Sequence, residues 1–142
     1  MIENNKKEID MTAWTVDASC LGNPGIMEYR CIDLSTRKEI FRMGPFEDGT
    51  NNIGEYLAIV HAMSLMVKNN DYHTIYSDST TAMNWIQKKR HNSKLKPTSK
   101  NGYLFELLSQ ADKWLKDNTF NSPILKWQTD KWGEIPADFG RK

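Results

Sequence analysis

The stretch TAWTVDASCLGNPG, residues 12–25, decides the fold. Trp14, Val16 and Ala18 alternate with polar residues, as in a strand that buries one face, and this alternation places Asp17 on the opposite face. The segment LGNPG at 21–25 then supplies the glycine, asparagine and proline residues that favour a turn. We therefore expect a strand that carries an acid near its middle and ends in a turn.

The residues that follow predict two further strands and then a helix. The runs 26–34 and 39–43 are β-like and are joined by the short segment 35–38, which predicts an antiparallel meander of three strands. After the segment GPFEDGTNN, Asn52 is expected to cap a helix. Its apolar residues fall mostly on one face and are Ile53, Leu57, Val60, Ala62, Met63 and Met66.

The second half of the chain alternates strands and helices. We expect a strand at 73–77 that ends at Asp78, a helix at 80–89, a polar and basic stretch at 88–102, a helix at about 103–116 and a last strand at 124–128. This order predicts an α/β fold with a mixed five-stranded sheet, first an antiparallel meander and then parallel strands, flanked by helices.

Length and composition predict one folded domain. The chain has 142 residues and is 39% hydrophobic, which suits a single core. We expect a flexible N-terminal segment at 1–11 and the domain at 12–142. The two cysteines, Cys20 and Cys31, form no CxxC pair, which fits a reducing cytoplasmic location better than a thiolate zinc site. No apolar run approaches the ~20 residues of a membrane span, and the polar start lacks a signal-peptide core.

Charge is distributed unevenly. Residues 1–87 hold 12 acidic and 7 basic residues, whereas residues 88–116 hold 2 acidic and 8 basic residues. A basic segment beside an acidic half is expected if the protein binds a polyanion and its acidic centre collects cations. A solvated basic face would produce the same numbers, so charge alone leaves both interpretations open.

Four acids stand in contexts that could bring them to one point: Asp17, Glu55, Asp78 and Asp138. Clustered carboxylates need cations, and hard divalent cations prefer oxygen ligands. Hydrolysis of a phosphodiester commonly uses two such ions held by carboxylates. Taken singly, these acids could instead be a turn residue, a first-turn helix acid, an N-cap and a tail charge.

Together, four segments resemble the catalytic blocks of type 1 ribonuclease H, most closely the branch found in Bacillus-like bacteria. They are DASCLGNPGIMEY (17–29), GTNNIGEYLAIVHAM (49–63), IYSDSTTA (75–82) and ILKWQTDKWGEIPADFGRK (124–142). The similarity runs from about residue 12 to the C-terminus in the family order. It implies a ribonuclease H-like fold and an endoribonuclease that cleaves the RNA strand of RNA/DNA hybrids, leaving 3′-hydroxyl and 5′-phosphate ends.

The resemblance also implies roles for individual residues. Asp17, Glu55, Asp78 and Asp138 would hold two Mg²⁺ ions, with Mn²⁺ as an alternative, in a monomeric enzyme. Many members of the family carry a His-containing loop shortly before the last aspartate, whereas the shorter loop with Glu134 matches the Bacillus-like branch. By this resemblance Glu134 would disturb one metal ion and assist product release. Hybrid contacts would come from Gly22, Asn23, Thr50, Asn51, Asn52, Thr80, Trp85, Ser93 and Lys94.

Several of these substrate contacts have structural alternatives. The Gly22–Asn23 pair also serves ordinary turn chemistry, Trp85 could belong to the core, and Lys94 replaces the hydroxyl residue expected in a phosphate pocket. None of the three histidines, His61, His73 and His91, lies in a motif. Two other functions remain open from the sequence: a related nuclease that cuts DNA, and a binding module without turnover.

Overall fold

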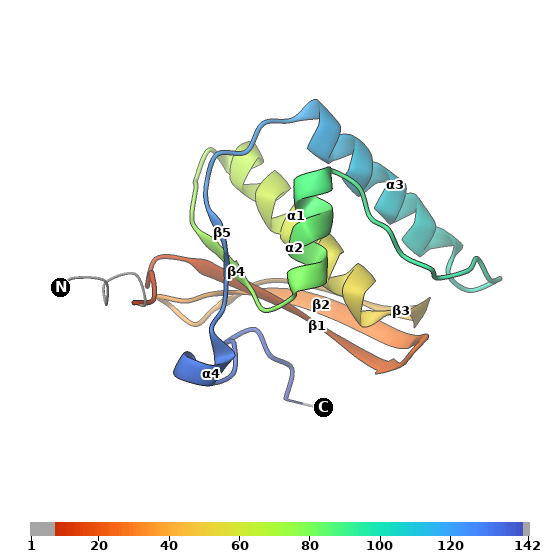
Figure 1. The fold of residues 1–142 in the computed structure, drawn as a ribbon, viewed down its shortest axis with the longest axis horizontal. Helices are drawn as coiled ribbons and strands as arrows, with labels where there is room; N and C mark the ends of the chain where they lie inside the picture. The colour runs from red at the N-terminus through yellow and green to blue at the C-terminus, as the bar shows by residue number, and fades with distance from the viewer. Residues whose placement is uncertain (1–7, 141–142) are drawn as a thin grey trace.

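A computed structural model describes residues 8–140 and contains one five-stranded sheet in the order β3-β2-β1-β4-β5 (Figure 1). The strands β1 (Trp14–Gly22), β2 (Gly25–Asp33) and β3 (Glu39–Gly49) form an antiparallel meander. The strands β4 (Ile75–Ser77) and β5 (Ile124–Lys126) add to β1 in parallel. The mixed sheet predicted from the sequence is therefore confirmed.

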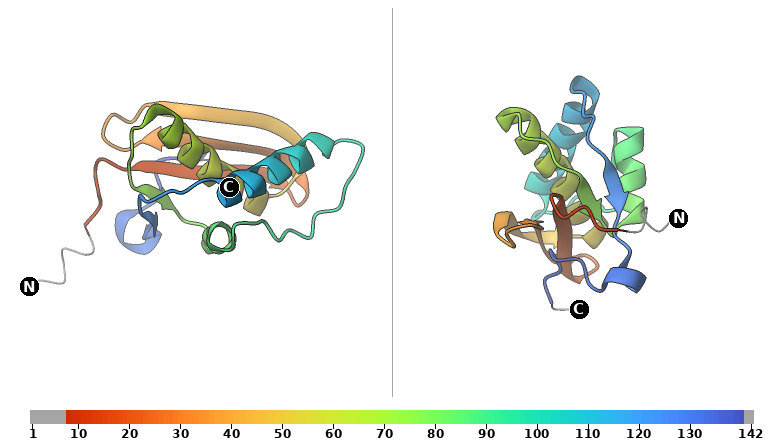
Figure 2. Two further views of the ribbon diagram at one scale, coloured as in Figure 1. Left: turned by 90° about the horizontal axis from the view of Figure 1, so that it is seen from above. Right: turned by 90° about the vertical axis from the view of Figure 1, so that its left-hand side faces the viewer.

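The helices cover the two faces of the sheet unequally. The helices α1 (Asn51–Asn69), α2 (Thr80–Lys88) and α3 (Gly102–Asp117) lie on one face, whereas the short α4 (Thr129–Trp132) and the C-terminal segment lie on the other (Figures 1 and 2). The main core fills the space beneath the three long helices. A smaller cluster packs Tyr76 with Ala13, Leu34, Trp127 and Ile135. No helix within residues 8–140 is long and apolar enough to cross a membrane.

Several element ends differ from the sequence prediction. The prediction that Asn52 caps α1 is wrong: the cap is Thr50, whose backbone is extended and whose hydroxyl accepts a hydrogen bond from the Ile53 amide at 3.4 Å. The third strand continues past Met43 to Gly49, and α4 is an additional element. The predicted strands 73–77 and 124–128 are shorter, at Ile75–Ser77 and Ile124–Lys126.

The predicted flexible segment 1–11 lies partly outside the described residues, which begin at residue 8. Within the described part, Ile9 packs against the smaller cluster. The Asp10 backbone N–H donates to the Tyr76 hydroxyl at 2.9 Å. Residues 9 and 10 therefore contact the domain directly.

Gly54 allows α1 to lie directly on the meander. A Cβ at this position would stand 2.7 Å from the Ala18 Cβ on β1 and 2.8 Å from the Met27 Sδ on β2. Real Cβ atoms do not approach other atoms so closely, so the helix can reach this depth only with glycine at residue 54. The next residue, Glu55, is thereby held against β1.

We predict that Gly54→Ala lowers the free energy of unfolding by about 1–3 kcal/mol, because the added methyl group overpacks the interface between α1 and the sheet. Urea denaturation measures the change. Gly102→Ala is the matched control, since a Cβ there meets nothing within 4 Å. Equal destabilisation by the two substitutions would contradict this account of α1 packing.

Candidate active site

Three carboxylates from distant parts of the chain meet at one place. One oxygen from each of Asp17, Glu55 and Asp78 lies within 4.8 Å of the others. The side chains of Asp17 and Glu55 are almost completely buried, with 1% and 2% of their surface exposed, and Asp78 is partly buried. Three acids in so small a volume repel one another and could together hold a metal ion.

The sheet and α1 bring these acids together. The strands β1 and β4 run parallel, with Trp14 beside Ile75 and Thr15 beside Tyr76. Continuing this register by two residues brings Asp78, just after β4, level with Asp17 on β1. From the helix side, Glu55 Oε2 accepts a hydrogen bond from the Ala18 backbone N–H at 3.3 Å. Backbone geometry therefore fixes all three positions.

The closeness of the three acids disfavours the charged form of Glu55. Burial raises the pKa of Glu55 well above its usual value, and the neighbouring carboxyl of Asp17 and the charge of Asp78 raise it further. The Ala18 N–H lowers the pKa but does not offset these effects. In addition, Glu55 Oε1 is buried and has no hydrogen-bond partner among the described residues.

These properties fit a hard divalent cation. The three side chains offer only carboxylate oxygens, which Mg²⁺ and Mn²⁺ accept as ligands and which softer metals favour less. A bound cation would neutralise the repulsion and coordinate the buried Glu55 oxygen. The donor set and the burial of its members therefore suit the metal ions expected from the sequence.

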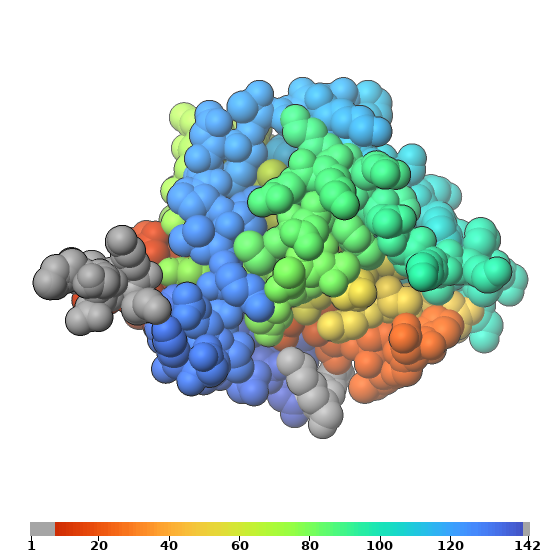
Figure 3. Space-filling model, viewed as in Figure 1, coloured from red at the N-terminus to blue at the C-terminus, as the bar shows by residue number. Residues whose placement is uncertain are grey.

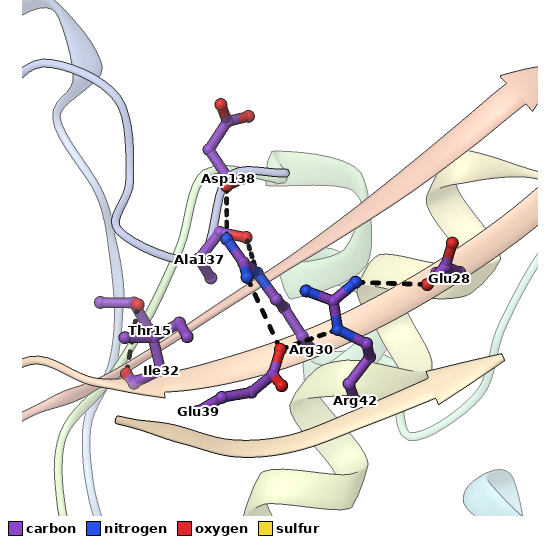
Figure 4. Close-up of polar contacts among 8 residues, drawn as sticks. All are labelled: Thr15, Glu28, Arg30, Ile32, Glu39, Arg42, Ala137 and Asp138. Atoms are coloured by element: carbon purple, nitrogen blue, oxygen red, sulfur yellow. Dashed lines mark hydrogen bonds and ion pairs between the residues drawn. The ribbon is translucent and has the colours of Figure 1, made fainter. Parts of the chain in front are cut away.

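Asp138 reaches the sheet by a different route. It lies on the C-terminal segment beyond α4, and the Arg30 guanidinium on β2 donates hydrogen bonds to the backbone carbonyls of Ala137 and Asp138 (Figure 4). In this view the Asp138 carboxylate points away from Arg30. Asp138 Oδ2 accepts a hydrogen bond from the Gly140 N–H at 3.1 Å. Asp138 is not a member of the group formed by the other three acids.

Glu134 lies on the same segment, between α4 and the buried Ile135. Its side chain is exposed. It is not among the three clustered carboxylates, so its catalytic role stays a prediction.

A groove of about 620 Å³ gathers six of the nine predicted substrate residues: Asn23, Thr50, Asn52, Trp85, Ser93 and Lys94. The tip of the β1–β2 hairpin, the start of α1, α2 and the loop after α2 meet on this face (Figure 3). The other three residues, Gly22, Asn51 and Thr80, do not line the groove, but each adjoins a residue that does. Residues as far apart in the sequence as Asn23 and Lys94 thus line one groove.

Trp85 combines both interpretations that the sequence left open. It is only 7% exposed and packs edge-on against Tyr56, with ring centroids 5.7 Å apart, so it belongs to the core. It also lines the groove. The packing of Trp85 against Tyr56 therefore gives the groove an aromatic side whose ring is held in place.

The loop between α2 and α3 is held by partly buried polar contacts that were not predicted from the sequence. The Asn101 side chain donates to the carbonyls of Asp48 and Lys96, at 3.2 and 3.0 Å, and accepts from the Thr98 N–H at 2.8 Å. At the other end, His91 Nδ1 lies 2.9 Å from Asp112 Oδ2. These contacts shape the part of the loop that carries Ser93 and Lys94.

We predict that Mg²⁺ raises the melting temperature of the protein, because a bound cation relieves the repulsion among the three acids. Asp78→Asn should stabilise the metal-free protein by about 1 kcal/mol, a figure that allows for the partial exposure of Asp78. It should also reduce the effect of Mg²⁺. Thermal unfolding in EDTA and in millimolar Mg²⁺ checks both expectations, and a wild-type melting temperature insensitive to Mg²⁺ would contradict them.

Comparison with known proteins places this site in a family. A model of the RNase H family matches residues 9–126, which covers Asp17, Glu55 and Asp78 and ends before Glu134 and Asp138. LC11-RNase H1, isolated from compost by a metagenomic approach, has a similar structure, with 16% identity, a TM-score of 0.54, and coverage of 85% of this chain and 88% of that chain. A second structure of LC11-RNase H1, in complex with an RNA/DNA hybrid, is 17% identical, with a TM-score of 0.53 and coverage of 84% of this chain and 86% of that chain.

RNase H1 from the halophilic archaeon Halobacterium salinarum is 18% identical, with a TM-score of 0.49 and coverage of 84% of this chain and 86% of that chain. At 16% and 17% identity, the likeness to the two LC11-RNase H1 structures concerns the fold alone. The family assignment rests on the match over residues 9–126. The finer resemblance to the branch in Bacillus-like bacteria stays a prediction. The chain belongs to the RNase H family and is a ribonuclease H.

Proposed function

We propose that this protein is an endoribonuclease that hydrolyses the RNA strand of RNA/DNA hybrids and leaves 3′-hydroxyl and 5′-phosphate ends. The observation that carries the proposal is the meeting of Asp17, Glu55 and Asp78 within 4.8 Å. The helices next to these acids also line the groove: Glu55 lies on α1, and Asp78 lies two residues before the start of α2. A duplex in the groove would therefore pass the acids.

Asp17, Glu55, Asp78 and Asp138 would together hold two Mg²⁺ ions, or Mn²⁺ in their place. When bound, such ions activate water, polarise the phosphate and stabilise the leaving oxygen. The chain itself contributes a fixed arrangement of charge: Asp17 is held on a central strand and Glu55 by the Ala18 amide. Because both carboxylates are buried, little water competes for their oxygens.

Glu134 would act after the chemical step. Its exposed carboxylate lies four residues before Asp138 on the segment that follows α4. An acid that is free of the packed core can move toward the metal ligands or away from them, and we propose that it disturbs one ion and so assists product release.

The groove has the chemistry that a hybrid requires. Asn23, Thr50 and Asn52 present small polar side chains, which suit the 2′-hydroxyl groups exposed in the wide minor groove of an A-like duplex. Across the groove, Lys94 and Lys96 can neutralise phosphates of the second strand. The complex of LC11-RNase H1 with an RNA/DNA hybrid shows that a protein of this fold binds such a duplex.

The remaining substrate contacts would flank the groove. We propose that Gly22 and Asn51 approach the RNA strand with their backbone or side-chain amides, that Thr80 lies near the bases, and that Ser93 contacts a phosphate of the DNA strand. The enzyme would act as a monomer. Cys20 and Cys31 are free thiols, which fits a reducing compartment such as the cytoplasm.

We predict that Asp78→Asn lowers the rate of hybrid cleavage about 1,000-fold or more, because losing one ligand charge removes roughly 4 kcal/mol of transition-state stabilisation. Hybrid affinity should change little, since the groove residues remain. Single-turnover cleavage of a labelled hybrid in Mg²⁺ and filter binding measure the two quantities.

Asp71→Asn is the matched control for this prediction, because Asp71 is an exposed aspartate whose ion pair within residues 8–140 is with His73. It should cleave at the wild-type rate. The same assay with RNA/RNA and DNA/DNA duplexes tests the substrate. Faster cutting of duplex DNA, or wild-type activity of Asp78→Asn, would overturn the proposed function.

We predict that Lys94→Ala weakens hybrid binding about 3- to 10-fold and reduces the salt dependence of the affinity by about one phosphate contact. Lys68→Ala is the control, because Lys68 lies in the last turn of α1, about 27 Å along the helix from Thr50. Fluorescence anisotropy over a range of KCl concentrations gives, for each variant, the slope of log affinity against log salt concentration. Identical slopes for the two variants would remove Lys94 from the interface.

A further inference from the structure

Arg30 makes two hydrogen bonds to the segment that carries Asp138. Its Nε donates to the Ala137 carbonyl at 2.8 Å, and its Nη2 donates to the Asp138 carbonyl at 2.6 Å. Figure 4 shows both bonds reaching across to the C-terminal segment. These two carbonyls lie on either side of the Asp138 Cα. Fixing both restricts the backbone around that atom, and with it the direction of the Asp138 side chain.

The strand register places Arg30 where it can do this. Arg30 on β2 stands directly opposite Asp17 on β1. Directly opposed residues of an antiparallel pair point to the same face of the sheet, so the guanidinium rises from the face that carries Asp17. The sheet thereby links Asp17 and the Asp138 backbone through one cross-strand pair.

Neighbouring side chains hold the guanidinium in place. Glu39 Oε1 lies 3.5 Å from Arg30 Nη1 and 2.8 Å from Arg42 Nε. Both guanidinium groups lie against the Phe139 ring, with their carbons 4.9 Å and 5.1 Å from its centroid. The Arg30 side chain is 18% exposed, whereas that of Arg42 is 42% exposed. Arg30 is therefore the more desolvated of the two, which strengthens its charge-assisted hydrogen bonds.

We propose that Arg30 is a positioning residue for the reaction: it sets where the Asp138 carboxylate stands relative to Asp17. This inference rests on the proposed function, in which Asp138 is one of the four metal ligands. Other contacts near Asp138 include the buried Ala137, the bond from the Asp138 N–H to the Ile135 carbonyl at 2.8 Å and the bond from the Gly140 N–H to Asp138 Oδ2 at 3.1 Å. To these contacts Arg30 adds hydrogen bonds to the carbonyls on both sides of the Asp138 Cα. Only arginine offers two donors in a rigid fork that matches two successive carbonyls.

The test compares Arg30→Met with Arg30→Lys and with Arg42→Met. Arg42 is the matched control, because it contacts Glu39 and Phe139 as Arg30 does, whereas its hydrogen bonds go to the carboxylates of Glu39 and Glu28. A shift of about 1 Å in a catalytic group can cost ~100-fold in rate. We therefore expect Arg30→Met to lower kcat by about 10- to 100-fold with KM changed less than about threefold.

Two further measurements do not depend on turnover. Hydrogen exchange of the Asp138 amide in the metal-free protein should become about tenfold faster in Arg30→Met, since its segment is released. Calorimetric titration with Mn²⁺ should show weaker binding. Arg30→Lys, which keeps the charge but not the fork, should fall between the wild type and Arg30→Met in every measurement, and Arg42→Met should stay within about threefold of the wild type.

A double-mutant cycle separates positioning from a general loss of stability. If Arg30 acts through Asp138, adding Arg30→Met to Asp138→Asn should cost less than about threefold in Mn²⁺ affinity and in rate. Fully multiplicative losses, or unchanged amide exchange and kcat in Arg30→Met, would overturn the inference. Failure of the proposed function looks different: the wild type would leave the hybrid uncut, while amide exchange and Mn²⁺ binding would still report on Arg30.

Discussion

Mutual repulsion among Asp17, Glu55 and Asp78 is the constraint on which the rest of this structure depends. Two of these carboxylates are almost fully buried, and a raised Glu55 pKa follows from that burial and from its neighbours. Such a group persists only if the surrounding fold holds each member rigidly. The central strand β1, the end of β4 and the close seating of α1 at Gly54 provide that rigidity. A bound cation would offset the repulsion among the three carboxylates.

The fold was predictable where local pattern and tertiary structure agree. The alternation around Asp17 and the apolar face of α1 specify a strand and a helix without ambiguity, and both are confirmed. The predicted end of the third strand at Met43 was wrong because Gly44–Pro45 looks like a break, yet β3 is an edge strand with an irregular register, where proline is tolerated. The cap at Thr50 was missed because three consecutive residues, Thr50, Asn51 and Asn52, are all capable of capping.

The candidate site was predictable to the extent that its residues act through their own side-chain chemistry. The acids stand in recognisable segments, and the structure gathers three of them. Arg30 could not be found in this way, because it acts on backbone carbonyls and its importance depends on the pairing of β1 with β2. Asn101 was missed for a similar reason, since its three hydrogen bonds shape a loop and touch no motif. A register argument around Asp17 would have pointed to residue 30.

We propose that the carboxylates of Asp17, Glu55 and Asp78 share a divalent cation beside a groove that accepts a nucleic acid duplex. The most direct measurement is an anomalous difference map from crystals grown with Mn²⁺. The account predicts a peak coordinated by oxygens of all three side chains. A well-ordered crystal with no peak among these carboxylates at saturating Mn²⁺, or with peaks only elsewhere on the surface, would contradict it.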